Sequence, residues 1–560
     1  MPKWLTWLND QVPLRYGAWA TSAMLALVGL GLGWQERSGL WCVLGVTGAL
    51  FFVLGVRDVR QTQKAVLRNY PVIGHLRYLL EFIRPEMRQY FIEGDNEAAP
   101  FSRQQRSLVY QRAKGASDKR PFGTQKDVTA EGYEWLSHSV LPTHVASHDF
   151  RVMIGTGGSS CTQPYEASLF NISAMSFGAL SANAILALNH GAARGHFAHD
   201  TGEGSISRYH REGGGDLIWE IGSGYFGCRD EHGRFNEARF IENAREPQVK
   251  MIEIKLSQGA KPGHGGVLPG PKVTLEIAAA RGVPPGLDCV SPSSHSAFTT
   301  PLEMAHFIER LRQLSGGKPV GIKLCIGHPW EWFAMVKAMR ETGLWPDFIV
   351  VDGGEGGTGA APLEFTDHVG APLQEGLLLV HNTLVGLGER SRVRLGCAGK
   401  VVSAFDIARM MALGADWCNS ARGFMFSLGC IQAQTCHTGH CPTGVTTQDP
   451  MRARALVVPD KADRVLRYHQ NTLHALKELV EAAGLQHPHD ITADHIVRRG
   501  AGQVVHRLSN ALVFAKAGQL TAAEAGLSPW PQPVFEHYWH HAGTDSFALH
   551  PLGERSPAER

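Results

Sequence analysis

The chain has 560 residues, of which 43% are hydrophobic and 19% are charged. This composition allows a large buried core and excludes an intrinsically disordered protein. The 54 basic and 52 acidic residues nearly cancel, so the net charge gives no reason to expect a nucleic acid as a partner. The ten cysteines are too few and too unevenly spaced for a secreted disulfide framework. We therefore expect more than one domain, with the catalytic part in a reducing compartment.

Two uncharged, apolar segments lie near the N-terminus, at residues 17–34 and 39–56. About 18 to 20 apolar residues allow a helix to cross the hydrocarbon core of a membrane, and the short connection between the segments requires a hairpin. A signal peptide and a buried helical hairpin are the alternatives. The second apolar segment and the lack of a clear A-x-A-like cleavage site disfavour both. We predict a two-helix transmembrane hairpin.

Basic residues flank this hairpin on both sides. Lys3 and Arg15 precede it, and Arg57 and Arg60 follow it. By the positive-inside tendency, both ends of the hairpin face the cytoplasm. We therefore expect the protein in the inner (cytoplasmic) membrane, with two transmembrane helices and the catalytic domain facing the cytoplasm.

Composition and pattern divide the chain into parts. The expected parts are a transmembrane hairpin (1–56), an Arg-rich connector (57–164), a barrel domain (165–455) that includes a cysteine-rich segment (430–441), and a helical C-terminal extension with a tail (456–560). The connector contains a basic stretch, Arg84–Tyr90, that fits either a helix lying against anionic lipid or a solvated charged face. We prefer the solvated face.

From about residue 165, short apolar runs alternate with Gly-rich turns and helical periods. The runs that we predict as strands are 169–174, 196–200, 251–256, 287–290, 320–325, 348–352, 393–397 and 415–420. The clearest predicted helices are 181–193, 301–314, 331–342 and 404–413. This alternation places the domain in the α/β class and implies a parallel sheet, and eight such units match a (β/α)8 TIM barrel. A doubly wound sheet is the alternative, weakened because no G-x-G-x-x-G opens a helix after the first strand.

Polar residues follow the predicted strands, where a barrel has its active site. Those at the first three strand ends are Ser173, Ser176, Glu203, Lys255, Gln258 and Lys261. Lys323 lies inside an apolar run, where an unpaired ammonium is costly unless it faces a polar group. A salt bridge inside the barrel mouth and a polar ligand both satisfy this condition. We favour the ligand.

Three further loops at the predicted barrel mouth are suited to an anionic cofactor. The loop at 352–362 is rich in glycine, whose backbone can approach a ligand closely. The loops after the last two strands, at 396–400 and 419–423, lie where these barrels usually bind phosphate, and Arg422 suits a phosphate dianion. The pattern indicates a phosphorylated cofactor such as FMN.

Cys430, Cys436 and Cys441 lie within twelve residues of one another. Three clustered thiols indicate a ligand set, either for an iron-sulfur cluster or for zinc. Zinc would take His437 or His440 as its fourth ligand. The adjacent Cys-His and His-Cys pairs make that geometry crowded, so we favour the cluster.

These motifs, in this order along the chain, resemble the central FMN domain and iron-sulfur segment of glutamate synthase. The matching stretches are Ser173–Ser181, Thr201–Gly204, Lys255–Gly263, Gly265–Gly270, Gly356–Gly359, Gly429–Cys430 and Cys441–Asp449. The N-terminal hairpin and its Arg-rich connector resemble those of the membrane-anchored FMN-binding glutamate synthase family. The resemblance implies an FMN-binding (β/α)8 TIM barrel.

The resemblance also implies cofactors and roles. It assigns a 3Fe-4S cluster to the three cysteines and FMN to the barrel mouth, where a cation such as Lys323 stabilises the reduced flavin near N1 and O2. The implied FMN-binding residues are Ser173, Met175, Ser176, Glu203, Lys323, Gly356, Gly357, Gly399, Lys400, Ser420 and Arg422, and the implied catalytic residues are Lys323, Lys255, Gln258 and Lys261. In the family, electrons pass through the cluster to FMN for reductive amination of 2-oxoglutarate to L-glutamate.

The chain departs from the family pattern at several positions. It begins with apolar helices where glutamate synthases carry a glutaminase domain, so we expect ammonia from elsewhere. His264, Gly354–Glu355 and Asp367 replace residues usual in the family, which leaves open which 2-oxo acid or amino acid is the substrate. With no NAD(P)H fingerprint, we expect electrons from ferredoxin, a separate subunit or a membrane carrier. The alternative functions are a membrane-linked flavin dehydrogenase acting on an amino or hydroxy acid, and a non-catalytic redox relay.

Overall fold

The computed structural model describes residues 14–97 and 100–549. Lys3, used above for membrane orientation, and the end of the predicted tail at 554–560 lie outside the described residues. The chain divides into two compact units, with the boundary between Gly94 and Asp95.

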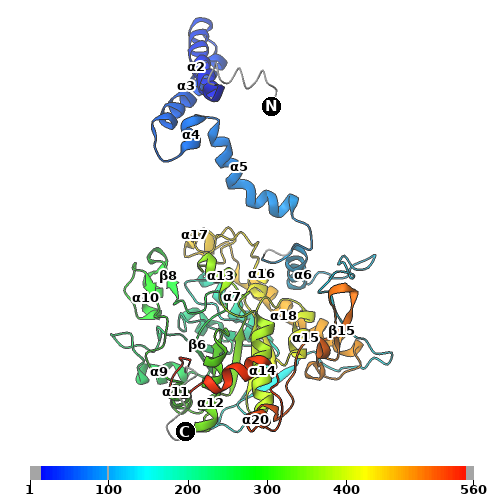
Figure 1. Ribbon diagram of the computed structural model, residues 1–560. Coiled ribbons are helices and arrows are strands. Elements are labelled where there is room, and N and C mark those ends of the chain that lie inside the picture. Colours follow the sequence, from blue (N-terminus) through cyan, green and yellow to red (C-terminus); the bar gives the residue numbers. More distant parts are fainter. Residues whose placement is uncertain (1–13, 98–99, 550–560) are drawn as a thin grey trace. The chain divides into compact units, whose positions relative to one another are not determined.

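The first unit contains a helical hairpin of α2 (Gly17–Glu36) and α3 (Gly39–Arg60), which lie side by side (Figure 1). Glycines line the contact between them: a Cβ added to Gly29 would lie 2.6 Å from the backbone of Gly45. Such small residues let two apolar helices approach closely. Both helices are long and apolar enough to cross a membrane. The remaining elements of this unit are η1 (Leu14–Tyr16), α4 (Ala65–Asn69), α5 (Gly74–Met87) and the π-helical turn η2 (Arg88–Ile92).

The second unit is built around a closed barrel of eight parallel strands. In spatial order, which is also chain order, the strands are β4 (Phe170–Ile172), β5 (His199–Asp200), β6 (Leu217–Ile221), β7 (Val249–Lys255), β10 (Val320–Leu324), β11 (Phe348–Asp352), β12 (Arg394–Ala398) and β13 (Trp417–Ser420). Pairing of β13 with β4 closes the barrel. The predicted α/β fold class and (β/α)8 TIM barrel are confirmed.

One predicted strand was wrong and one was missed. Residues 287–290 do not join the barrel, because their end forms β9 (Cys289–Val290), which pairs antiparallel with β8 (Val267–Leu268) in a small hairpin. The missed barrel strand is β6, which lies earlier in the chain, between β5 and β7, and whose apolar run is interrupted by Glu220. Lys255 therefore ends the fourth barrel strand and not the third.

Helices follow most of the strands and cover the barrel (Figure 1). They are α7 (Ala182–Gly195), α8 (Arg208–Gly213), α9 (Glu237–Ala244), α10 (Leu275–Arg281), α11 (Pro301–Leu314), α12 (Pro329–Thr342), α13 (Leu363–His368), α14 (Leu373–Leu387), α15 (Ala404–Ala412) and α16 (Arg422–Leu428), with the 3-10 turn η3 (Gly270–Lys272) before α10. Side-chain caps fix where several of them begin. Ser181 accepts a hydrogen bond from the Ala184 amide at the start of α7, and Thr300 with Glu303 forms a capping box at α11.

Segments before and after the barrel pack against it. The hairpin of β2 (Arg151–Ile154) and β3 (Tyr165–Ser168) contacts the starts of barrel strands, since Arg394 Nε donates to the Met153 carbonyl at 3.1 Å. The long helix α18 (Val458–Ala482) packs on α7 and on α6 (Arg103–Lys114). The other elements are β1 (Glu134–Leu136), α17 (Pro450–Ala453), η4 (Pro488–Asp490), β14 (Ile496–Arg499), η5 (Ala501–Gln503), β15 (Val505–Arg507), α19 (Leu508–Ala511), α20 (Gln519–Glu524), α21 (Pro533–Tyr538) and η6 (Trp539–His541).

Candidate active site at the barrel mouth

Lys323 lies on β10 with its ammonium buried among carboxyl groups from neighbouring strands. Its Nζ forms an ion pair with Glu220 of β6 and a second one, at 3.2 Å, with Glu253 of β7. The Lys323 side chain is only 5% exposed, so these partners replace water as the neighbours of its charge. The sequence analysis considered two partners for Lys323, a salt bridge and a polar ligand. The salt bridge is present, with Glu220 and Glu253.

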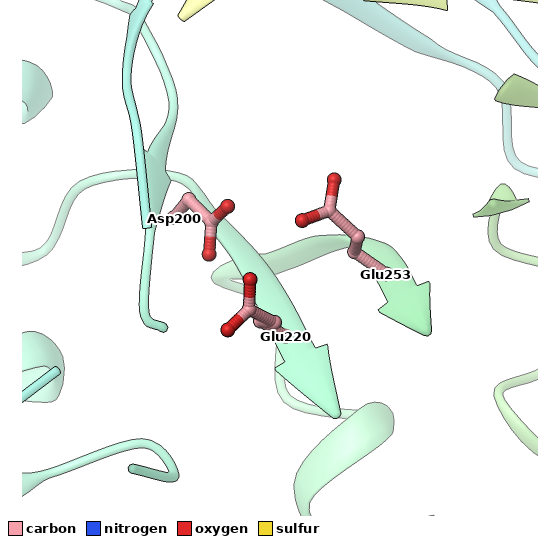
Figure 2. A group of neighbouring side chains, drawn as sticks. All are labelled: Asp200, Glu220 and Glu253. Atoms are coloured by element: carbon pink, nitrogen blue, oxygen red, sulfur yellow. The ribbon is translucent and has the colours of Figure 1, made fainter. Parts of the chain in front are cut away.

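Asp200, at the end of β5, forms a cluster of three carboxyl groups with Glu220 and Glu253 (Figure 2). One oxygen of each side chain lies within 4.8 Å of the others, and all three side chains are buried. Burial raises the pKa of Glu253 well above its usual value, and nearby Asp200 raises it further. Burial also raises the pKa of Asp200, although the charge of Lys323 opposes this. Both carboxyl groups are therefore harder to ionise than they would be in water.

A second ion pair lies nearer the mouth. Lys255, the last residue of β7, pairs with Glu203 at 3.1 Å. Burial alone would raise the pKa of Glu203, but the charge and hydrogen bond of Lys255 outweigh it and lower the pKa. Lys261 adds a further positive charge and donates from Nζ to the Gly265 carbonyl at 3.1 Å, and burial lowers its own pKa. A Cβ on Gly266 would lie 2.2 Å from Glu203 Oε1, so glycine there leaves room for this carboxylate.

The loops after β7 and β11 meet closely at the mouth. A Cβ on Gly259 would lie 1.8 Å from the Gly353 carbonyl oxygen, which allows only glycine at this contact. The Gly259 amide also donates to Asp352 Oδ2 at 2.9 Å. Burial raises the pKa of Asp352, opposed by the charge of Lys323. Gln258, predicted as catalytic, therefore stands next to a fixed backbone contact.

The glycine-rich loop after β11 joins the predicted phosphate residues to the cysteine segment. A Cβ on Gly357 would lie 3.7 Å from a guanidinium nitrogen of Arg422, which begins α16. A Cβ on Gly359 would lie 3.4 Å from the Cβ of Cys436. The loop therefore lies beside Arg422 at Gly357 and beside the cysteine segment at Gly359.

The three cysteines interact with one another and with a buried lysine. Burial raises the pKa of Cys430 to about 11, whereas hydrogen bonds from Thr443 and Thr446 outweigh burial and lower the pKa of Cys441 to about 7. Lys272 Nζ donates to the Cys436 carbonyl at 2.8 Å. Burial lowers the pKa of Lys272, while the charges of the Cys436 and Cys441 thiolates oppose that effect. The cysteine segment therefore has the ammonium of Lys272 next to it.

Several predicted cofactor residues lie at the mouth with their polar groups already engaged. The Ser420 hydroxyl donates to the Val401 carbonyl at 2.6 Å, and the Ser173 amide donates to the Ser420 carbonyl. The Ser176 hydroxyl accepts a 3.4 Å hydrogen bond from Arg281. The Lys400 ammonium lies 6.0 Å from the centre of the Phe101 ring. Met175 is buried, and Gly399 packs against α14, where a Cβ would contact Leu373.

The sequence analysis missed Glu220, Glu253 and Lys272 as site residues. The signal for the two glutamates was the one used for Lys323, a charged residue inside an apolar strand. Lys272 gave no comparable signal, because it stands in a polar turn far from the cysteines along the chain. Of the altered residues, His264 packs its ring edge-on against Phe365 of α13 at 5.3 Å.

Comparisons with known proteins identify the family of this chain. The conserved region of glutamate synthase matches residues 157–486. The chain is 38% identical over 510 residues to the glutamate synthase large subunit-like protein YerD of Bacillus subtilis, covering 83% of this chain and 95% of that protein. It is 34% identical over 330 residues to the archaeal-type glutamate synthase (NADPH) of Thermotoga maritima, covering 59% of this chain and 62% of that protein. A mutant flavocytochrome b2 with pyruvate bound aligns at 12% identity, with a TM-score of 0.40, over 81% of this chain and 92% of that one. The chain belongs to the glutamate synthase family.

Proposed function

We propose that this chain is a membrane-anchored, glutamate synthase-like oxidoreductase. It uses FMN and a 3Fe-4S cluster to aminate 2-oxoglutarate or a related 2-oxo acid reductively. The observation that carries the proposal is the loop after β11, which has Arg422 beside Gly357 and Cys436 beside Gly359. A flavin phosphate and a redox cluster at these two places would lie within one continuous site.

The donor set fits the cluster. Cys430, Cys436 and Cys441 supply three thiolates, the number that a 3Fe-4S cluster takes from the protein in this family. The Lys272 ammonium compensates part of the negative charge that three thiolates and the sulfides bring. Tyr110 of α6 donates to the Cys430 carbonyl at 2.6 Å and holds the start of the segment in place.

The barrel mouth fits FMN and an acidic substrate. Gly356 and Gly357 leave the backbone open beside Arg422, as close approach to a phosphate requires. Lys255 and Lys261 provide positive charge for substrate carboxylates, with Glu203 fixing the position of Lys255. When bound, FMN supplies a hydride and the cluster supplies single electrons. Lys323 contributes charge beneath this site, held by Glu220.

The source of electrons is proposed from the names of the relatives and from the glycine motifs of this chain. The relatives from Thermotoga maritima and Methanocaldococcus jannaschii are named as NADPH enzymes. Two stretches with the G-x-G-x-x-G spacing, Gly222–Gly227 and Gly354–Gly359, follow β6 and β11, but neither opens directly into a helix, as the dinucleotide fingerprint requires. We therefore propose that a ferredoxin, another electron-transfer protein or a membrane carrier delivers electrons to the cluster, and that ammonia arrives free or from a partner.

Cofactor analysis of anaerobically purified protein tests the proposal. We expect about one FMN and about three irons per chain, with the EPR signal of an oxidised 3Fe-4S cluster. Cys436→Ser should lose the iron and retain FMN. Cys161→Ser, a cysteine outside the segment, should keep both. A protein with stoichiometric zinc in place of iron, or with neither cofactor, would overturn the proposal.

A further inference from the structure

Helix α5 presents an apolar stripe that its own unit does not cover. Leu76, Leu79 and Leu80 are 51%, 55% and 54% exposed, and Met87 is 43% exposed. At about 100° per residue, these positions and Ile83 lie on one side of the helix. The stripe continues in η2, where Phe91 is 78% exposed. So many exposed large apolar side chains on one short segment mark a surface that binds an apolar partner.

The charged residues of α5 lie beside the stripe. Arg77, Glu81 and Arg84 lie on one flank, the charged side, where Arg77 Nε contacts Glu81 Oε1 at 2.9 Å, and Glu86 lies on the other flank. Arg88 follows α5 as the first residue of η2. The stretch from Arg77 to Arg88 therefore has three arginines and two glutamates. A helix with one apolar side and arginines on its polar side matches the pattern of helices that lie in the interface of an anionic membrane.

Helix α5 is fastened to the end of the apolar hairpin. Asp58, in the last turn of α3 and 2% exposed, accepts a hydrogen bond from the Val72 amide at 2.9 Å. The same carboxylate pairs with His75 Nε2 in the first turn of α5 at 2.9 Å. The first turn of α5 is therefore held at the end of α3, where the predicted membrane span ends.

We infer that α5 lies in the membrane interface, with its leucine stripe in the boundary of the acyl chains and its arginines at anionic lipid headgroups. This inference rests on the proposed insertion of the hairpin in a membrane. It differs from the solvated charged face that the sequence favoured, because a solvated helix would leave these leucines in water, which is unfavourable. The connection through Asp58 favours lipid over a protein partner for the stripe.

Site-specific photocrosslinking in the full-length protein tests the inference. Benzoylphenylalanine replaces Leu79 on the apolar stripe, Glu81 on the charged side, or Leu27 in α2, which is 77% exposed. Each protein is reconstituted in vesicles of equimolar phosphatidylcholine and phosphatidylglycerol and irradiated. Mass spectrometry then identifies the adducts. We expect lipid adducts at positions 79 and 27, and severalfold fewer at position 81.

The three positions separate the possible failures. Lipid adducts at position 27 together with adducts at position 79 only to protein, of this chain or a second copy, would overturn the inference and leave the membrane anchor standing. Equal yields of lipid adducts at positions 79 and 81 would also overturn it, because the helix would then have no preferred side. An absence of lipid adducts at position 27 would overturn the membrane anchor and the inference with it.

Discussion

At the residue scale, the barrel interior is governed by an imbalance of charge. Asp200, Glu220 and Glu253 gather around the single ammonium of Lys323. In a buried setting an uncompensated carboxylate takes up a proton. Burial raises the pKa values of Asp200 and Glu253, while Glu220 and Glu253 both pair with Lys323. These differences lead to different expectations for two similar substitutions.

Replacing Glu253 by glutamine should change how stability depends on pH. The pKa of Glu253 is raised in the folded state, so the folded protein binds this proton more tightly than the unfolded chain does. The contribution of Glu253 to stability is then fully present below the unfolded pKa of about 4.3 and is lost, by up to about 1.4 kcal/mol per pH unit, as the pH rises through the folded pKa. The Glu253→Gln protein should lose this slope. Urea unfolding at several pH values measures it, and parallel curves for the two proteins would contradict the assignment.

Replacing Glu220 by glutamine should lower the free energy of unfolding far more than replacing Glu253 does. It removes the partner of a buried ammonium, which costs about 3–5 kcal/mol in comparable buried pairs. The double variant Glu220→Gln with Lys323→Met removes both charges and should recover a substantial part of that loss. The free energy of unfolding at neutral pH decides the point. Equal stability of the single variant and the wild type would show that the ion pair contributes nothing.

The charge of Lys272 should affect how easily the proposed cluster is reduced. Lys272 Nζ lies against the cysteine segment, and a nearby cation favours the state with an extra electron. Lys272→Met should lower the midpoint potential, so that the reduced fraction at a fixed potential falls severalfold. Lys272→Arg, which keeps the charge, should stay near the wild type. EPR-monitored redox titration with iron analysis checks this, and an unchanged potential in a fully loaded Lys272→Met protein would refute it.

At the element scale, the sequence predicted strands and helices where local signals are strong. The predicted helix 301–314 matches α11, whose start is defined by the capping residue Thr300 and by Pro301. The strand β6 was missed because Glu220 breaks its apolar run, and the run at 287–290 was mistaken for a barrel strand because an apolar pattern does not reveal its pairing partner. The partner of Lys323 also depended on register across three strands, which local sequence does not encode.

The contact between the loops after β7 and β11 should be intolerant of any side chain at Gly259. A Cβ there would overlap the Gly353 carbonyl oxygen, which is backbone and lacks room to move. Gly259→Ala should therefore push the two loops apart and lower the bound FMN content severalfold. Gly327→Ala is the matched control, since a Cβ at Gly327 meets nothing within 4 Å. Flavin absorbance of the purified proteins gives the result, and full flavin content in Gly259→Ala would be inconsistent with the proposed site.

At the scale of the whole molecule, family and fold follow from long-range order in the sequence, whereas the substrate depends on a few side chains. The motifs from Ser173 to Asp449 fall in one order along the chain, and the conserved region of glutamate synthase covers 157–486. The positions that differ from the family pattern, His264 and Asp367 among them, lie in loops and short helices around the mouth. Their effect on an acidic substrate depends on geometry that a family match does not specify.

The central claim is that electrons entering the cluster reach a 2-oxo acid through the barrel mouth. Anaerobic turnover of the purified full-length protein tests it most directly, with a chemical reductant, 2-oxoglutarate and ammonium as substrates and with L-glutamate measured as the product. The account predicts glutamate formation by the wild type and its loss in Cys436→Ser. Failure to form glutamate by a protein loaded with flavin and iron, together with oxidation of glutamate when a quinone is the acceptor, would contradict it.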